Sequence, residues 1–494
     1  MELRPYQLTA SEWLAEHSQA LLADEMGLGK TCELIRGADL VRRRRIVIVC
    51  PVILCQHWLD EIHRWSDHWA TARLTGTRMT DLAARLQSDH LWPGTEAVVL
   101  NYDILHAYDQ VLGAWADLVI FDESHYLKNK GEFVGTHIKG VRRTAHASRL
   151  SQMVRNHGGS VWLATGTPMP SKPVELYSQL KILGVTNKLG FDWEYYITRY
   201  CDGKLVWVPQ RNGKPRRVWK YDGATNLKEL RTKLDKSVML RRMRRDVMPD
   251  ITVMPPALVS VPLDPMIMTE YAAAEKNITD YMGQRAYEIA CAIGSATPDN
   301  DAVIARMKAE AAKHLVELSQ LRRLAGEAKA DSVISWVREW LEGGSGLGHG
   351  RKLVLFGHHR STLETIATAF RTTAVIGGVS NNIRDQVISD FQNNPNTRLI
   401  VLSTQAAGIG LNLTASSDVV FSEYEWTSAS HRQATDRCAR HGQKNPVSVT
   451  YLVARETIDA YMATHIANQM AVVDAVFGAN DVASEVIKEL IINA

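Results

Sequence analysis

Residues 20–35, "ALLADEMGLGKTCELI", have the composition of a phosphate-binding turn between a strand and a helix. The apolar residues at 20–23 predict a strand, and the apolar spacing after Lys30 predicts a helix. A glycine-containing turn in this place presents backbone N–H groups and a helix N-terminus to phosphate groups. Lys30 would then contact the β- and γ-phosphates of a nucleotide, and the Thr31 hydroxyl would bind magnesium. The generic motif begins with glycine where this chain has Asp24, so an ordinary turn remains an alternative for this segment alone.

A pair of carboxylates supplies a second chemical feature. The segment "VIFDESH" (119–125) is an apolar strand pattern that ends in Asp122 and Glu123. At the carboxyl end of a strand, Asp122 would hold magnesium through the nucleotide and Glu123 would orient and deprotonate an attacking water. The alternative is a solvated strand end that caps a helix. The phosphate-binding turn in the same predicted sheet favours the catalytic interpretation.

Two arginines late in the chain could complete such a site. In "HRQATDRCARHGQ" (431–443), Arg437 and Arg440 are three residues apart and would share one face of a helix. Two guanidinium groups from a second lobe could stabilise the charge that develops on a γ-phosphate. The alternative is a basic surface helix that only forms salt bridges.

The elements that would position these residues alternate between short apolar segments and helical patterns, which is typical of parallel sheets with crossover helices. The predicted strands form two sets, 20–23, 46–50, 98–102, 117–123 and 160–164, then 352–357, 373–377, 397–403, 417–422 and 447–453. The sequence therefore predicts an α/β fold with two parallel-sheet lobes separated by a mainly helical insert. We expect the domains to be residues 1–184, 185–325 and 326–494.

Composition excludes several classes of protein. The chain has 494 residues, 45% apolar and 22% charged, as in ordinary globular proteins. Its longest apolar run, Ile46 to Cys55, is short and contains a proline, so we expect no membrane span, and "MELRPYQL" lacks an apolar secretory core. The six cysteines are scattered without a CxxC pattern, which favours reduced thiols in the cytoplasm and argues against structural zinc.

The predicted insert carries a concentration of positive charge. Residues 201–245 contain fourteen Lys and Arg against four Asp and Glu, in a chain whose net charge is +3. Within them, "KLVWVPQRNGKPRRVWKY" (204–221) predicts a β-hairpin with Trp207 and Trp219 on its arms and a turn at Asn212-Gly213. Basic and aromatic residues together suit nucleic acid, and the predicted contacts are Arg211, Lys214, Arg216 and Arg217. The alternative is a solvated hairpin whose tryptophans pack on a lobe.

The order of the motifs resembles that of superfamily 2 helicases. The matching segments are "LRPYQ", "DEMGLGKT", "VCPVILCQHW", "DESH", "TGTP", "QAAGIGLNL" and "QATDRCARHGQ". The chain is most similar to the Swi/Snf-type DNA translocases, and "DESHYLKN", "TGTPMPSKPVELYSQLKIL", "MLRRMRRDVMPDI", "LFGHHRSTLE" and "VVFSEYEW" look like the annealing-helicase, fork-remodelling branch. The resemblance extends from Leu3 to about Asp459.

The resemblance implies two RecA-like lobes that bind ATP and magnesium in their cleft and duplex DNA across their tops. It gives Gln7 the adenine, Asp24, Gly27, Gly29, Lys30 and Thr31 the phosphates and metal, Asp122 and Glu123 the hydrolysis, and Arg437 and Arg440 the role of arginine fingers beside Gln443. It places DNA-backbone contacts near Pro51, Trp58, Asn101, Tyr102, His358, Ser403 and Thr404. The chain departs from the usual pattern at "IGGVSNNIR", which puts DNA contacts there in doubt, and at His441, where an isoleucine is usual.

Three functions remain open at this stage. The first is an ATP-driven translocase that remodels duplex, forked or branched DNA, and the second is a strand-separating helicase that uses the same motor. The third is a clamp that uses ATP only to change conformation, which the presence of both carboxylates and both arginines disfavours. Such a bare motor would suit a phage or a bacterium, so we expect a monomer in the cytoplasm of a bacterial or phage-infected cell.

Overall fold

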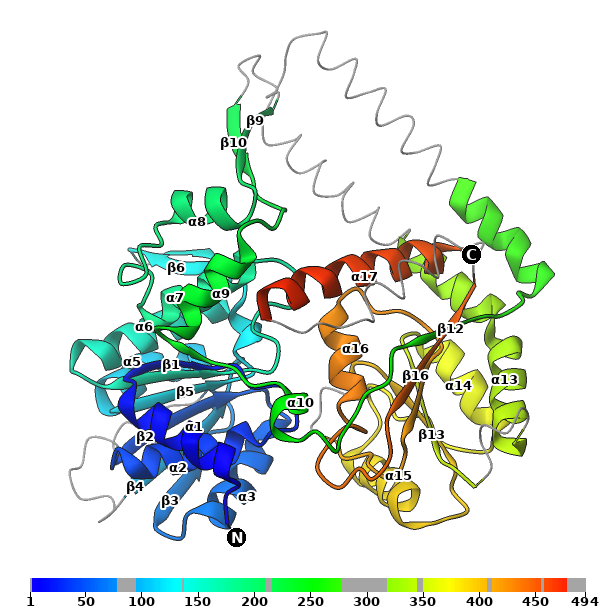
Figure 1. The fold of residues 1–494 in the computed structure, drawn as a ribbon, viewed down its shortest axis with the longest axis horizontal. Helices are drawn as coiled ribbons and strands as arrows, with labels where there is room; N and C mark the ends of the chain where they lie inside the picture. Colours follow the sequence, from blue (N-terminus) through cyan, green and yellow to red (C-terminus); the bar gives the residue numbers. More distant parts are fainter. Residues whose placement is uncertain are drawn as a thin grey trace. The chain divides into compact units, whose positions relative to one another are not determined.

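The computed structural model describes residues 2–77, 95–135, 137–208, 216–276, 318–343, 350–406, 411–454 and 457–477. These residues form two compact units, each built on its own parallel sheet. The first unit consists chiefly of Met1–Gly203 and Tyr221–Ile251, and the second chiefly of Lys204–Lys220 and Thr252–Ala471. The predicted α/β class with two parallel-sheet lobes is confirmed (Figure 1).

Seven parallel strands form the sheet of the first unit. From edge to edge they are β11 (Met239–Leu240), β1 (Gln19–Leu22), β8 (Ser160–Ala164), β5 (Leu118–Asp122), β2 (Arg45–Cys50), β4 (Thr95–Asn101) and β3 (Trp69–Arg73). The five strands predicted for this lobe are all present. The two edge strands were not predicted, because β11 has only two residues and β3 buries only its first residue completely.

Helices cover both faces of this sheet. The described helices of this unit are α1 (Pro5–Glu16), α2 (Lys30–Leu40), α3 (Leu54–Trp65), α5 (Leu105–Trp115), α6 (Arg142–Asn156), α7 (Val174–Leu183), α8 (Trp193–Tyr200), α9 (Leu227–Asp235) and α10 (Arg244–Val247). The unit also has a 3-10 turn at Ser124–Leu127 and a small hairpin of β6 (Gly131–Val134) and β7 (His137–Gly140). One core joins alternate strand residues, such as Ile48 and Ile120, to apolar side chains of α1, α2 and α3. Figure 1 shows α1 and α2 side by side over this face. On the other face, α5 and α6 pack together.

The second unit has a five-stranded parallel sheet. Its order is β12 (Ala257–Ser260), β16 (Ser448–Val453), β15 (Asp418–Phe421), β13 (Leu353–Gly357) and β14 (Leu399–Ser403). Its helices are α13 (Ala330–Glu342), α14 (Arg360–Ala369), α15 (Asn381–Asn393), α16 (Ser428–Thr435) and α17 (Ile458–Phe477). Four of the five strands predicted here are confirmed. The strand predicted at 373–377 is wrong, because only Val375 makes a bridge, to Leu402, before the chain turns at Gly378.

The predicted hairpin is present as β9 (Lys204–Val208) and β10 (Arg216–Lys220), which pair antiparallel. Its predicted turn at Asn212-Gly213 lies outside the described residues. The division into three domains stays a prediction, since the described part of the chain groups into two units and residues 277–317 are not among it. In the described ranges, no helix is both long and apolar enough to cross a membrane.

Candidate functional site

The turn between β1 and α2 has the geometry that its glycines predict. Gly27 and Gly29 have φ values of 84° and 92°, in the left-handed region that glycine adopts most readily. A Cβ on Gly29 would lie 2.3 Å from Nε2 of Gln7, so a larger residue there would displace the Gln7 side chain. α2 begins at Lys30, as predicted, and Thr31 lies half-buried in its first turn. The backbone can therefore present N–H groups at a helix N-terminus.

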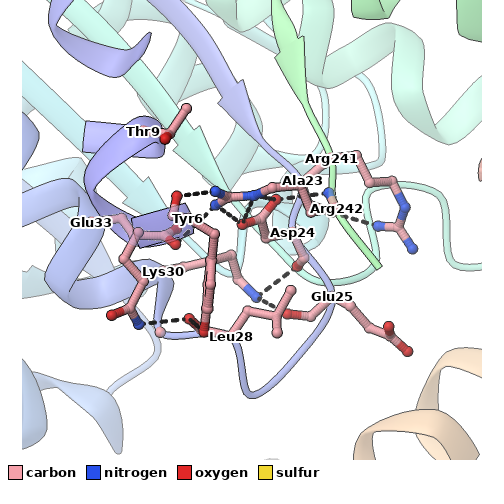
Figure 2. A network of polar contacts seen from close by, with 12 residues as sticks. Tyr6, Thr9, Ala23, Asp24, Glu25, Leu28, Lys30, Glu33, Arg241 and Arg242 are labelled. Carbon is pink, nitrogen blue, oxygen red and sulfur yellow. Dashed lines mark hydrogen bonds and ion pairs between the residues drawn. The ribbon is translucent and has the colours of Figure 1, made fainter. Parts of the chain in front are cut away.

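Lys30 and Gln7 both contact the backbone of this turn, and Figure 2 shows the contacts of Lys30. The Lys30 ammonium donates hydrogen bonds to the carbonyls of Asp24 at 2.9 Å and Glu25 at 3.3 Å. Gln7 donates to the carbonyl of Leu28 at 2.9 Å, while its side-chain carbonyl accepts a bond from the backbone N–H of Arg4, the residue that precedes α1. These two predicted nucleotide ligands thus lie at opposite ends of one turn.

Asp24, in contrast, is bonded to a residue from late in the first unit. Its carboxylate is fully buried and accepts hydrogen bonds from the guanidinium and from the backbone N–H of Arg242, the latter at 2.8 Å. The same guanidinium donates to Glu33 of α2 at 2.9 Å. A partner for Asp24 was not predicted from the sequence. The only signal was the basic stretch "MLRRMRRDV", which contributed charge to the predicted insert but no contact with the turn.

The acidic pair lies at the carboxyl end of β5. Asp122 is buried and accepts bonds from the Trp58 indole N–H at 2.8 Å and from the Glu123 backbone N–H at 2.9 Å. Burial and the neighbouring charge of Glu123 raise the pKa of Asp122 to about 6. Glu123 has φ and ψ of 50°, and its carboxylate lies 3.2 Å from Nδ1 of His125 and 3.4 Å from the hydroxyl of Thr165. Two neighbouring carboxylates with these surroundings favour a cation beside Asp122.

The loop after β8 connects the turn to the acidic pair. β8 lies between β1 and β5, and its loop contains the predicted "TGTP" segment. A Cβ on Gly166 would lie 2.3 Å from the side chain of Met26 and 3.4 Å from Nζ of Lys30. The structure therefore brings Lys30, Thr165 and the acidic pair together at one edge of the sheet.

Two residues predicted to contact DNA in this unit have buried side chains. Trp58 is completely buried, and Tyr102 is 3% exposed and donates its hydroxyl hydrogen to the carbonyl of Asp122 at 2.7 Å. Both side chains bond to Asp122 and are buried, so in this structure they support the acidic pair. Pro51 and Asn101 are half-buried at the ends of β2 and β4, and Asn101 accepts bonds from the backbone of the turn that follows it.

Predicted DNA contacts in the second unit have a similar outcome. Ser403 and Thr404 are buried, and their hydroxyl groups bond to backbone groups of Ala406 and Gly357, which contradicts a direct side-chain contact with DNA. His358 is half-buried, and its Nδ1 lies 2.6 Å from a carboxylate oxygen of Glu425. Only His358 among these three keeps a partly exposed side chain.

The predicted helix does not extend to the two candidate arginine fingers. α16 ends at Thr435, and the turn that follows contains Arg437 and Arg440. The helix ends because the N–H groups of Arg437 and Cys438 bond to carbonyls three residues back, which tightens the last turn. Arg440 donates to the carbonyl of Leu411 at 3.1 Å. The buried Gln443 donates to three backbone carbonyls, those of Thr414, Ser416 and Cys438, so it holds this turn in place.

The hairpin presents an aromatic and a basic side chain together. Trp207 pairs with Arg217 across the strands, and the Arg217 guanidinium lies 4.9 Å from the centroid of the Trp207 ring. Trp207 is 60% exposed, so it does not pack on a lobe as the alternative interpretation required, whereas Trp219 is half-buried. Arg216 begins β10, and the predicted contacts Arg211 and Lys214 lie outside the described residues.

No group of three or more His, Cys, Asp or Glu side chains in the described ranges could hold a metal ion by itself. A metal at Asp122 would therefore take its remaining ligands from water and from a bound phosphate chain. The residues present fit a nucleotide with magnesium, because the glycine turn offers N–H donors and Asp122 offers an oxygen ligand.

Two family descriptions match the chain. The SNF2-related domain matches residues 6–288, and the helicase conserved C-terminal domain matches residues 334–442. The Homo sapiens protein DNA annealing helicase and endonuclease ZRANB3 is 30% identical over 91% of this chain and 38% of its own length. The Xenopus laevis SWI/SNF-related matrix-associated actin-dependent regulator of chromatin subfamily A-like protein 1 is 28% identical over 93% of this chain and 42% of its own length. The chain thus spans well under half of the length of these relatives.

Among solved structures, the Sulfolobus solfataricus SWI2/SNF2 ATPase core in complex with double-stranded DNA is 20% identical, covering 99% of this chain and 96% of that chain, with a TM-score of 0.39. At that score the two structures do not superpose closely enough for their sites to be compared. The sequence match to the first domain, which extends over more than half of the chain, is sufficient for the family. This chain belongs to the SNF2-related family.

Proposed function

We propose that the chain is a DNA-dependent ATPase motor that translocates on duplex or branched DNA and remodels forks and junctions. The observation that carries the proposal is the meeting of the Lys30 turn, Gly166 and the Asp122–Glu123 pair at one edge of the first sheet. Ligands of parallel sheets bind at that edge. A lysine that reaches phosphates, beside a carboxylate pair, is the arrangement that nucleotide hydrolysis requires.

Each side chain of this site has a distinct part in the proposal. Lys30 would neutralise the β- and γ-phosphates, while Thr31 and Asp122 would hold magnesium, which when bound offsets charge on the phosphates. Glu123 would accept a proton from the attacking water, and its left-handed backbone turns it away from the strand direction. Gln7 would recognise the base from the neighbouring α1.

Residues of the second unit would complete hydrolysis when the lobes close. Arg437 and Arg440 would stabilise the transferring phosphoryl group, and Gln443, bonded to three carbonyls, would keep their turn in shape. Fingers of this kind affect turnover more than binding, because they act only in the closed state.

DNA is proposed as the substrate because two relatives are named for such work: one is an annealing helicase and the other belongs to a chromatin-regulator group. The hairpin supports this, since residues 204–220 contain six Lys and Arg and no Asp or Glu. An exposed Trp207 beside Arg217 can stack on an unpaired base, as aromatic side chains do in single-strand binders. Partly exposed His358, Pro51 and Asn101 remain candidate contacts.

The ATPase rate of the purified full chain, measured with single-stranded, duplex, forked and four-way DNA at several salt concentrations, tests this proposal. We expect stimulation by duplex and branched DNA above that by single strands, with apparent DNA affinity falling steeply with salt. Stronger stimulation by single strands would favour the second candidate function, that of a strand-separating helicase. The absence of DNA-stimulated hydrolysis would favour an ATP-gated clamp and would refute the motor.

Exchanging residues 204–221 for a short Gly/Ser loop tests the hairpin separately. ATP hydrolysis uses none of its residues, so we expect most duplex-stimulated ATPase to remain while fork regression and branch migration are lost. Trp207→Ala and Arg217→Ala should each reproduce part of the loss, with Leu205→Ala, on the same strand as Trp207, as the matched control. Intact remodelling, or ATPase and remodelling falling together, would contradict this role.

A further inference from the structure

A segment from late in the first unit lies along the first half of the phosphate-binding turn. Residues 239–247, here named the arginine segment, begin as β11 beside β1 and continue into α10. Arg241 donates to the carbonyls of Ala23 at 2.5 Å and Gly166 at 3.2 Å. Arg244 donates through its guanidinium to the carbonyl of Met26 at 2.9 Å, and through its backbone N–H to the carboxylate of Glu25 at 2.6 Å. Four consecutive residues of the turn, 23 to 26, are therefore bonded to this one segment.

Arg242 is the centre of the contact (Figure 2). Its guanidinium joins Asp24 and Glu33, two carboxylates whose side chains are 0% exposed, and also donates to the carbonyl of Tyr6. Burial and the charge of Asp24 raise the pKa of Glu33, and Arg242 opposes that effect. Without this cation, two buried carboxylates would face each other beneath the turn.

We infer that the arginine segment is a positioning element of the nucleotide site, with Arg242 setting the shape of the phosphate-binding turn and linking its occupancy to the segment that leads into the second unit at Thr252. The inference rests on the proposed nucleotide binding. It assigns Asp24, which stands where the generic motif has glycine, as the anchor for Arg242 instead of a phosphate ligand. Coupling of this kind is reciprocal, so a nucleotide in the turn must also stabilise the segment.

Hydrogen–deuterium exchange of the full chain tests the coupling directly. The N–H groups of Arg242 and Arg244 are bonded to side chains of the turn, at Asp24 and Glu25. Adding magnesium and a non-hydrolysable ATP analogue should slow exchange in peptides that cover residues 239–247 at least several-fold. If the analogue binds and exchange there is unchanged, the inference is wrong while the proposed function survives. If the wild-type chain binds no nucleotide, both are wrong.

Variants test Arg242 as a positioning residue. Arg242→Met alone leaves buried carboxylates unpaired and is expected to unfold easily, so the decisive protein is the triple variant Arg242→Met, Asp24→Asn, Glu33→Gln, which leaves no charge there. We expect it to fold, to bind a fluorescent ATP analogue at least tenfold more weakly, and to lose the exchange protection. If the triple variant kept the nucleotide affinity and the exchange protection of the wild type, the contact of Arg242 with Asp24 and Glu33 would be structural only.

Two further variants keep the test decisive. Arg242→Lys retains the positive charge but not the fork that joins two carboxylates, so we expect a folded protein whose nucleotide affinity is lowered about threefold to tenfold. This variant replaces the triple variant if the latter does not fold, and unchanged affinity in it would overturn the inference. Arg245→Met is the matched control, because Arg245 belongs to the same segment and is exposed, with an ion pair to its neighbour Asp246. The control should leave affinity and exchange as in the wild type.

Discussion

Each sheet has two acidic residues at the carboxyl end of a central strand, and the two pairs differ in their surroundings. Asp122, the last residue of β5, accepts bonds from two uncharged N–H groups, and burial raises its pKa to about 6, while Glu123 lies beside His125. After β15, Glu423 and Glu425 lie beside His359 and His358. Burial acts to raise the pKa of both glutamates, but the bonds from these histidines hold it below the usual range. Among the described residues, a histidine lies beside Glu123 but not beside Asp122 in the first pair, whereas both glutamates of the second pair have a histidine beside them.

The comparison teaches that acidic residues at equivalent strand ends need not share a role. A carboxylate with a raised pKa gains from a bound cation, since the cation offsets the burial of its charge. A carboxylate that is hydrogen-bonded to a histidine is stabilised by a group that the fold already supplies. We therefore expect substitutions in the first pair to alter turnover and substitutions in the second pair to alter stability.

The largest effect is expected at the first pair and its lysine. Lys30→Ala or Glu123→Gln should lower DNA-stimulated ATPase at least a hundredfold, because each removes charge stabilisation or the base from the reacting centre. Glu123→Gln should still bind the nucleotide and DNA, because it spares the glycine turn and Asp122. The readouts are the steady-state rate and the affinity for a fluorescent ATP analogue. An active Glu123→Gln enzyme would remove this residue from the mechanism and break the comparison.

A smaller effect on turnover is expected from the second unit. Arg440→Ala should lower the rate at saturating DNA about tenfold or more while ATP affinity changes only a few-fold. Arg440 also donates to the Leu411 carbonyl, so Arg440→Lys serves as a control for that bond. Loss of folding in both variants, or unchanged turnover in both, would make Arg440 structural and require another finger.

Glu423→Gln should have the complementary effect. The change keeps the shape of the side chain but removes the charge that pairs with His359, and the backbone N–H groups of His358 and His359 also bond to it. We expect the free energy of unfolding to fall by about 1–3 kcal/mol. Urea titration of the full chain measures this, with Glu123→Gln as the comparison that should unfold at nearly the wild-type midpoint. If instead Glu423→Gln matched the wild type in stability and lost ATPase, the two pairs would be alike after all.

A dependence of stability on pH, with no effect expected on turnover, originates in the second unit. His431 is buried against Glu425, and burial lowers the pKa of His431 to about 4 from a usual value of 6.5. The unfolded chain therefore binds a proton that the folded chain does not, so stability is lost as pH falls from 6.5 towards 4, by at most about 1.4 kcal/mol per pH unit. Urea midpoints at pH 7, 6 and 5 measure the slope. His431→Gln should flatten it, and the exposed His441→Gln should not.

Much of this arrangement could be predicted from sequence because it depends on local patterns. Apolar runs such as 46–50 and the glycines at 27 and 29 determine strands and a left-handed turn by short-range sterics. The pairing of Asp24 with Arg242 could not be predicted, because the two residues are 218 positions apart and no periodic sequence pattern links two charged residues. The burial of Trp58 and Tyr102 was missed for another reason. An aromatic side chain that also carries a polar group suits a surface groove as well as a core. The end of α16 at Thr435 was missed because the helical spacing of the arginines continues beyond the helix.

The position of β11 has a consequence for how the chain is made. Leu21 and Leu22 of β1 pair with Met239 and Leu240, so one edge of the strand that leads into the glycine turn stays open until the ribosome has synthesised residue 240. Until then the β1 edge exposes unpaired backbone groups, and Asp24 has no cation to accompany it into the core. A nascent or truncated chain that ends after α8 would contain every residue of the phosphate-binding turn but would lack β11 and the arginine segment that contact it. Late closure of this edge delays completion of the first sheet until more than 200 residues after its first strand have emerged.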